Sequence, residues 1–214
     1  MTLRAIETLK SVDLIAAEDT RHTRILTQHY QIETPVTSYF EHNELKKAEY
    51  LLNLLNEGKN IALVTDAGTP GISDPGFHLI RLAQENEIPL TVIPGPTALI
   101  AALSLSGLPA HNFVFEGFLP VKSTARRKKL EEIRGERRSI IFYESPYRLL
   151  KTLQDIREVL NNPYVVCVRE ITKKFETVQK GMADELVGFF QRNKPRGEFV
   201  LVLNFEYQPP TGRL

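Results

Sequence analysis

Apolar runs alternate with helix-like patterns along the first half of the chain. Short apolar runs, typical of buried strands, cover Val12–Ala17, Pro35–Phe40, Ile61–Val64 and Pro89–Ile93. Between them, apolar residues recur at three- and four-residue spacing, which predicts helices. The expected helices cover residues 1–12, a stretch ending near Tyr30, residues 45–57, Phe77–Gln84 and Ala98–Leu105. Strands that alternate with helices in this way predict an α/β domain with a parallel, doubly wound sheet.

The second half of the chain has a different pattern, because several strands follow one another closely. The expected strands are Phe113–Phe118, Ser139–Tyr143, Tyr164–Ile171, Phe175–Gln179 and Glu198–Phe205. One helix is expected to begin at Ser145, a good N-cap that a proline follows, and another covers residues 184–191. This order predicts a second α/β domain with a mixed sheet. We place the domain boundary near residue 110, which gives domains of residues 1–110 and 111–214.

The stretch Ile61–Gly76 is the most informative part of the sequence. After the apolar run, Asp66–Gly71 contains two glycines and a proline, which end a strand and let backbone approach a ligand. We expect Asp74 to cap the next helix, with Pro75 at its first position. Ligands bind open α/β sheets where strands pass into helices, so this loop is a candidate binding site. The alternative is a tight turn that only joins two packed elements.

Polar residues gather at the ends of the expected strands. The four groups are Glu18 with Asp19, Glu41 with His42, Asp66–Thr69 and Pro94–Thr97. Because the carboxyl ends of parallel strands share one edge of a sheet, we expect these groups to converge.

Composition narrows the class of protein. The chain has 214 residues, of which 42% are hydrophobic and 25% charged, and these proportions exclude wholesale disorder. Its one cysteine, Cys167, has no partner for an internal disulfide, which fits a reducing compartment. No apolar run approaches the roughly 20 residues of a membrane span. We therefore expect a cytoplasmic protein.

A basic segment, residues 122–138, stands out because the net charge of the whole chain is only +1. It includes four consecutive cations, Arg126, Arg127, Lys128 and Lys129. Such clustering fits contacts with the phosphates of a nucleic acid. A solvated protein face is the alternative.

Seven stretches together carry a resemblance to a known family. They are EDTRHT (Glu18–Thr23), EHNE (Glu41–Glu44), VTDAGTPGISDPG (Val64–Gly76), IPGPTALIAALSLSGLP (Ile93–Pro109), EGFLP (Glu116–Pro120), FYESPYRL (Phe142–Leu149) and REITKKFET (Arg169–Thr177). In this order they resemble the bacterial 16S rRNA (cytidine-2′-O)-methyltransferases of the tetrapyrrole methylase superfamily. The resemblance implies a two-domain tetrapyrrole-methylase-like fold that binds S-adenosylmethionine in a cleft between the domains. It also implies a homodimer whose substrate is a cytidine ribose in the decoding region of 16S rRNA, within the small ribosomal subunit.

Methyl transfer from a sulfonium needs positioning of the cofactor and removal of a proton from the ribose hydroxyl. Small residues and backbone N–H groups suit the cofactor, and the candidates are Asp66, Ala67, Gly68, Thr69, Pro70, Gly95, Pro96 and Thr97. Asp66 either accepts from a ribose hydroxyl or braces its own loop. Candidates for the general base that takes the proton of the 2′-hydroxyl are Glu18, Asp19, His22, Glu144 and Glu170.

Any one of these side chains could instead hold a neighbouring arginine, and we rank Asp19 and Glu144 first as catalytic residues. Arg21, His22 and the four consecutive cations are the candidate RNA contacts, and no spacing of ligand residues indicates a metal site.

Two other classes of function stay open. A methyltransferase acting on a small tetrapyrrole would not need the basic segment, whereas a non-catalytic RNA-binding or assembly module is favoured by the absence of the first loop of similar proteins. Similar proteins begin with a strand and a Pro-Ile-Gly-Asn type loop ahead of the first helix, whereas this sequence starts at that helix. We therefore expect the chain as given to bind the cofactor weakly and to be a poor enzyme.

Overall fold

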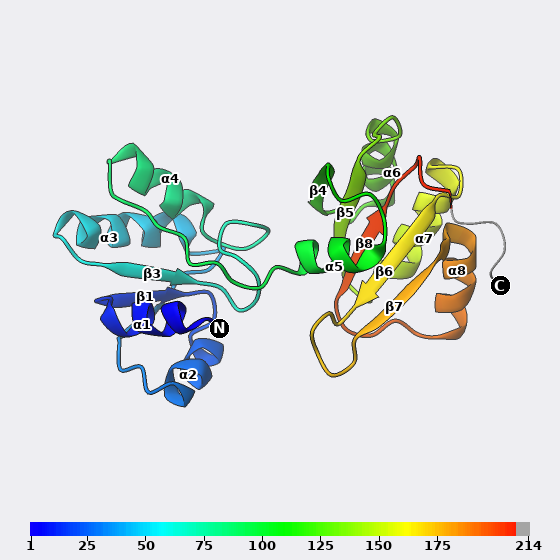
Figure 1. The fold of residues 1–214 in the computed structure, drawn as a ribbon. Coiled ribbons are helices and arrows are strands. Elements are labelled where there is room, and N and C mark those ends of the chain that lie inside the picture. Colours follow the sequence, from blue (N-terminus) through cyan, green and yellow to red (C-terminus); the bar gives the residue numbers. More distant parts are fainter. Residues whose placement is uncertain (209–214) are drawn as a thin grey trace. The chain divides into compact units, whose positions relative to one another are not determined.

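The computed structural model describes residues 1–208, so residues 209–214 of the second expected domain lie outside the described residues. The chain divides into two compact units, Met1–Thr97 and Ala98–Leu214. Both are α/β structures, as the sequence predicts, and each is described by itself below (Figure 1).

The first unit contains a parallel sheet of three strands in the order β2-β1-β3. Its elements in chain order are α1 (Leu3–Ser11), β1 (Leu14–Ala17), α2 (Thr20–His29), β2 (Val36–Ser38), α3 (Glu44–Asn56), β3 (Ile61–Val64) and α4 (Phe77–Glu85). The register pairs Ala17 with Ser38 on one side and with Val64 on the other. The three strands therefore end at the same edge, as parallel strands joined by helical crossovers must.

Helices cover both faces of this sheet, as expected for a doubly wound domain. Ala16 of β1 packs with Ala48 and Leu51 of α3 and with Leu79 of α4. The alternate β1 residues Ile15 and Ala17 face the other side, where they pack with Leu9 of α1 and with Ile32, which follows α2. This alternation follows from the two-residue period of a strand.

The second unit contains a mixed sheet of five strands in the order β4-β5-β8-β6-β7. Its elements are α5 (Ala98–Ser106), β4 (Phe113–Phe118), α6 (Ser123–Glu132), β5 (Ser139–Glu144), α7 (Leu149–Val159), β6 (Tyr164–Arg169), β7 (Thr177–Met182), α8 (Ala183–Arg192) and β8 (Phe199–Leu203). Only β4 and β5 are parallel, and the other neighbours pair antiparallel.

This second sheet is also covered on both faces. Residues of α6, α7 and α8, including Leu130, Leu153 and Leu186, pack on one face with Phe142. The apolar helix α5 packs on the other face, where Leu103 lies in a cluster with Val166. Among the described residues, no helix is long and apolar enough to cross a membrane.

Packing of α5 explains why the structure divides the chain at a different place from the expected boundary near residue 110. Helix α5 contacts β8, β5 and β6 of the second sheet, so it belongs to the unit that starts at Ala98. The sequence shows that this helix is apolar nearly all round, but not which sheet it covers.

Three local expectations are wrong. Residues 89–93 form no strand, because no neighbouring strand forms hydrogen bonds with their backbone. Leu90 and Val92 are exposed. Helix α4 is capped at Gly76, whose φ of 147° few other residues adopt, and not at Asp74. After β5, residues 146–148 form a turn, so α7 begins at Leu149 and Ser145 does not cap it.

Candidate functional site

The ends of β1 and β3 are joined by hydrogen bonds between the residues that follow each strand. The backbone N–H of Glu18 donates to the carbonyl of Val64 at 3.2 Å, which extends the ladder by one step. In return, the N–H of Asp66 donates to Glu18 Oε2 at 3.1 Å. Two of the four expected polar groups, those of β1 and β3, therefore meet at this edge.

Asp19 begins the next helix and is fully engaged there. Its side chain caps α2 by accepting from the Arg21 N–H at 2.8 Å. The Arg21 guanidinium also donates to both carboxylate oxygens. These hydrogen bonds hold the pKa of Asp19 far below its ordinary value. Asp19 is thus an ionised capping residue rather than a ready proton acceptor.

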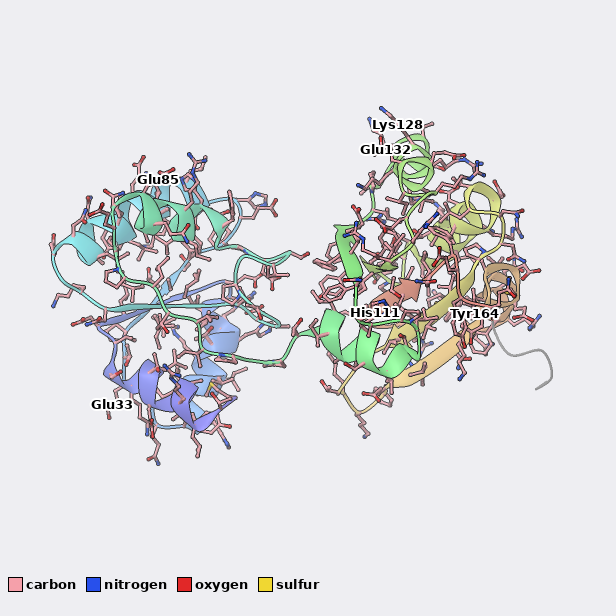
Figure 2. All side chains as sticks on the ribbon, turned by 45° about the horizontal axis from the view of Figure 1, so that its top comes forward. Glu33, Glu85, His111, Lys128, Glu132 and Tyr164 are labelled. Atoms are coloured by element: carbon pink, nitrogen blue, oxygen red, sulfur yellow. The ribbon has the colours of Figure 1, made fainter. Side chains whose placement is uncertain are left out.

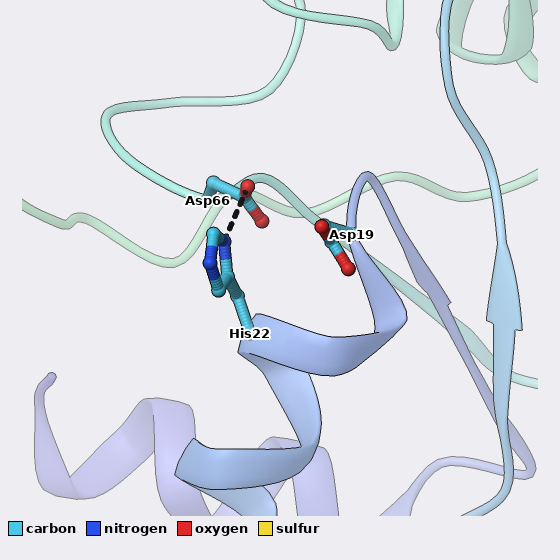
Figure 3. A group of neighbouring side chains, drawn as sticks. All are labelled: Asp19, His22 and Asp66. Atoms are coloured by element: carbon cyan, nitrogen blue, oxygen red, sulfur yellow. Dashed lines mark hydrogen bonds and ion pairs between the residues drawn. The ribbon is translucent and has the colours of Figure 1, made fainter.

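His22 lies one helical turn further on and faces the loop after β3 (Figure 3). Its Nδ1 lies 2.8 Å from Asp66 Oδ2, and the two side chains come from positions 44 residues apart. The hydrogen bond to Asp66 raises the pKa of His22, and the charges of Asp66 and Asp19 act in the same direction. The sequence names His22 as an RNA contact or a candidate base and Asp66 as a cofactor contact or a brace of its own loop, but it does not predict this pair.

The same edge of the sheet is strongly acidic. Asp74, further along the loop, is half-buried, and burial raises its pKa to about 6, with smaller contributions from the charges of Glu18 and Asp66. Together with Asp19, these residues form the acidic cluster, defined as Glu18, Asp19, Asp66 and Asp74. A cationic ligand group would be attracted to it.

A metal ion is one chemical possibility for part of this cluster. Asp19, His22 and Asp66 each offer one donor atom, and these atoms all lie within 4.8 Å of one another. Asp19 is already bound to Arg21, and His22 to Asp66. A cation would have to displace both interactions, and the absence of a metal site stays a prediction.

The loop after β3 presents free backbone donors, as the cofactor expectation requires. The N–H groups of Ala67, Gly68 and Thr69 donate to no acceptor within residues 1–208. Gly68 has a φ of +83°, and a Cβ there would lie 3.4 Å from the carboxylate of Asp74. Ala67 and Gly68 are exposed, while Thr69 and Pro70 are half-buried. The loop can therefore offer hydrogen bonds to a ligand that lies against it.

Glu44 holds the far end of this loop, a role that the sequence did not reveal. Its Oε1 accepts from the N–H of Gly76 at 3.1 Å, from the N–H of His78 at 3.2 Å and from the Tyr39 hydroxyl at 3.0 Å. A carboxylate at the N-terminus of α4 also suits the helix dipole. The only available signal was the position of EHNE at the end of a strand.

Two of the expected groups make no hydrogen bond to the acidic cluster in the described chain. Glu41 and His42 are exposed on the turn after β2, and neither bonds to the acidic cluster in the described chain. Pro94–Thr97 has no regular secondary structure, and Gly95 and Pro96 are exposed. A Cβ added at Gly95 would meet nothing within 4 Å. The cofactor roles of Gly95, Pro96 and Thr97 thus remain predictions.

Glu144, the second expected catalytic residue, is buried at the end of β5 with 2% of its surface exposed. Its Oε2 accepts from the Thr152 hydroxyl at 2.6 Å and its Oε1 from the Ser145 N–H at 2.8 Å. Arg148 lies beside it, with Nε 3.3 Å from Oε1. The carboxylate therefore ties β5 to α7, and a ribose hydroxyl could not reach it without a large rearrangement.

The basic segment is less available than its sequence indicates. Arg126 is 3% exposed and forms an ion pair with Asp155, so its expected role as an RNA contact is wrong for this structure. Arg127 pairs with Asp155 and Glu158, and Lys129 pairs with Glu116. Lys128 has no ion-pair partner among residues 1–208, and Figure 2 shows it on the outer side of α6. Consecutive residues of a helix point to different sides, so these four neighbouring cations have different surroundings. The run of cations in the sequence does not show this difference.

A separate hollow of about 460 Å³ lies in the second unit. Its lining includes His111, Arg137, Arg138 and Tyr207, and it contains none of the predicted site residues. The sequence gives no signal for this hollow, because its residues come from three distant segments.

Comparison with known proteins defines the class to which this fold and loop belong. The model of the family described as Tetrapyrrole (Corrin/Porphyrin) Methylases matches residues 1–187, and the chain belongs to that family. The structure of the methyltransferase CobJ has the same fold, with a TM-score of 0.72, 17% identity and coverage of 99% of this chain and 91% of CobJ. Uroporphyrin-III C-methyltransferase from Thermus thermophilus, solved with S-adenyl homocysteine, has a TM-score of 0.63 and 17% identity, and the match covers 95% and 90% of the two chains.

Curated relatives are considerably more similar in sequence. Ribosomal RNA small subunit methyltransferase I of Escherichia coli is 51% identical over 206 residues, which cover 95% of this chain and 72% of the relative. The protein of the same name from Synechocystis sp. is 52% identical over 204 residues, covering 95% and 73% of the two chains. The expected family and fold are therefore confirmed, and the chain is an enzyme of the methyltransferase class.

Proposed function

We propose that this chain transfers a methyl group from S-adenosylmethionine to the 2′-hydroxyl of a cytidine in the decoding region of 16S rRNA. The observation that carries the proposal is identity of 51% and 52%, over 95% of the chain, with relatives named for methylation of small-subunit ribosomal RNA. The structural neighbour whose title names a uroporphyrin methyltransferase is only 17% identical. Because the chain is far more similar to the relatives named for ribosomal RNA, we favour RNA over a tetrapyrrole as the substrate.

The loop after β3 supports S-adenosylmethionine as the cofactor, which supplies an electrophilic methyl group when it is bound. The free N–H groups of Ala67, Gly68 and Thr69 suit its carboxylate or ribose oxygens. The acidic cluster suits its ammonium and sulfonium charges. The related structure from Thermus thermophilus was solved with S-adenyl homocysteine, which supports the same choice.

Exposed cations supply the expected attraction to RNA. Lys128 on α6 is exposed, and so is Arg21 on α2, whose side chain is 84% exposed although it is bound to Asp19. Arg127 and Lys129 would first have to leave their carboxylate partners. We also propose that the enzyme works as a homodimer in the cytoplasm and that its substrate is the assembled small subunit.

The proposal can be tested with small ribosomal subunits from a strain that lacks this methylation. The purified chain is incubated with them and with radiolabelled S-adenosylmethionine, and nuclease digestion followed by mass spectrometry locates the product. We expect one 2′-O-methylcytidine in 16S rRNA. Uroporphyrinogen III serves as the competing substrate. Methylation of the porphyrinogen with none of the rRNA would refute the proposal, as would cofactor binding without transfer to either substrate.

A further inference from the structure

The His22–Asp66 pair has the geometry of a base and the group that orients it. Asp66 is an acceptor when ionised, so its 2.8 Å hydrogen bond requires a proton on His22 Nδ1. In the neutral ring, Nε2 is then the lone-pair acceptor. Nε2 makes no hydrogen bond with any residue from 1 to 208, and 65% of the His22 side chain is exposed. A substrate hydroxyl can therefore reach it.

The other candidate bases are all engaged. Asp19 caps α2 and holds Arg21, and Glu144 is buried against Thr152. Glu18 accepts from the Asp66 N–H. Glu170 accepts from the Glu198 N–H at 2.9 Å, and this bond lowers its pKa, so it is a weaker base than an ordinary glutamate. Of the five candidates, His22 is the exposed one, because Glu18, Asp19 and Glu170 are half-buried and Glu144 is buried.

The position of His22 also suits the reaction. It faces the first residue of the loop Asp66–Pro70, where the cofactor is proposed to bind. The charged groups facing His22 are Asp66 and Asp19, which raise its pKa, and Arg21, which lowers it, and the net effect is a raised pKa. A base whose pKa lies near the working pH is the most effective in proton transfer.

We propose that His22 is the general base of the methyl transfer and that Asp66 is its positioning residue, an inference that rests on the proposed function. The O–H bond of the ribose breaks and its proton passes to Nε2 of His22. The 2′-oxygen forms its bond to the methyl carbon as the carbon–sulfur bond breaks, and the sulfur keeps that electron pair as a neutral thioether. Asp66 holds the Nδ1–H tautomer and stabilises the imidazolium that results.

The first test compares His22→Ala with His42→Ala, an exposed histidine of the same unit whose ring bonds to no carboxylate among residues 1–208. General-base catalysis typically contributes about 10²–10⁴-fold, so kcat of His22→Ala should fall by at least about 100-fold. KM for the ribosomal subunit and affinity for S-adenosylmethionine should change little. Added imidazole should restore part of the rate, which a merely structural role would not allow.

The second test follows pH. The wild-type rate should rise with pH through the pKa of His22, because only the neutral ring accepts a proton. Asp66→Asn keeps an oxygen that can accept from Nδ1–H but removes the charge, so the rising limb should move to lower pH. Titration of the five histidines by NMR gives a readout independent of turnover, and the His22 resonance should show the same shift.

The outcomes separate this inference from the proposed function. If the wild type methylates rRNA and His22→Ala is as active as His42→Ala, the base assignment fails and the proposed function stands. A rise in KM alone, with kcat unchanged, would make His22 an RNA contact and would also overturn the assignment. If the wild type methylates no rRNA, the proposed function fails, and the inference fails with it.

Discussion

Asp155→Ala should strongly destabilise the second unit, because it would leave a buried guanidinium without its counter-ion. Arg126 Nε and Nη2 each lie 2.7 Å from Asp155 Oδ2, and only 3% of the Arg126 side chain is exposed. The remaining acceptors of this guanidinium are the carbonyls of Val121 at 3.1 Å and Pro120 at 3.4 Å. Neither carries a charge.

The size of the destabilisation by Asp155→Ala follows from the burial of the unpaired Arg126 guanidinium. Breaking a buried ion pair by removing one partner typically costs about 3–5 kcal/mol, since the other charge stays desolvated. For a unit of this size, that corresponds to a fall of about 10–20 °C in melting temperature. Arg126→Met should cost less, about 1–3 kcal/mol, because Asp155 keeps Arg127 at 3.1 Å and the Ser123 hydroxyl at 3.1 Å.

The assay is urea and thermal unfolding, with Lys128→Ala as the control on the same helix. Lys128 is exposed, so its replacement should change the free energy of unfolding by no more than about 0.5 kcal/mol. Small-subunit affinity should be the same for wild type and Arg126→Met at a temperature where both are folded. If Asp155→Ala is as stable as Lys128→Ala, the buried Arg126–Asp155 ion pair does not stabilise the second unit. If Arg126→Met weakens RNA binding and not stability, the prediction made from the sequence was right.

Three further predictions concern the loop and the basic segment. The pKa of Asp74 is raised from 3.8 to about 6, so its contribution to stability is fully present below pH 3.8 and is lost as pH rises through 6. Asp74→Asn should therefore have a higher melting temperature than wild type at pH 7.5. The difference should vanish near pH 4. An unchanged difference between those pH values would contradict this. Gly68→Val should weaken S-adenosylmethionine binding in calorimetry, because valine is strained at a φ of +83°, whereas Gly135→Val, with open space around it, should not. Equal affinities for the two variants would remove Gly68 from the cofactor site. Lys128→Ala should lower the slope of log K against log salt for subunit binding by about one, and an unaltered slope would exclude a phosphate contact.

Local pattern was enough to predict most of the fold, because each strand and helix shows the period of its own geometry. The run Ile61–Val64 and the spacing in α3 are examples, and both elements form as expected. The run Pro89–Ile93 has the same local character and forms no strand. A strand needs a neighbouring edge to bond with, and no apolar run reveals whether that edge exists.

Charged residues were predicted less well, because their roles depend on partners that sequence does not place. Arg126 and Lys128 are two residues apart and look equivalent in the run of cations. One points into the α6–α7 contact and meets Asp155, while the other faces solvent. The position of Glu144 at a strand end favours a catalytic role, but the sequence does not show that the side chain is buried against Thr152.

The His22–Asp66 pair follows from the sheet register once that register is known. Parallel pairing sets Ala17 beside Val64, so the residues just beyond them, Glu18 and Asp66, are near enough to bond. Asp19 then starts α2, and three residues later the helix has turned almost once, which returns His22 to the side of the loop. Each step is a short-range rule, yet the pair joins positions 44 residues apart. The parallel pairing of β1 with β3 is therefore what brings His22 to Asp66, and the proposed role of His22 as a base depends on that pairing.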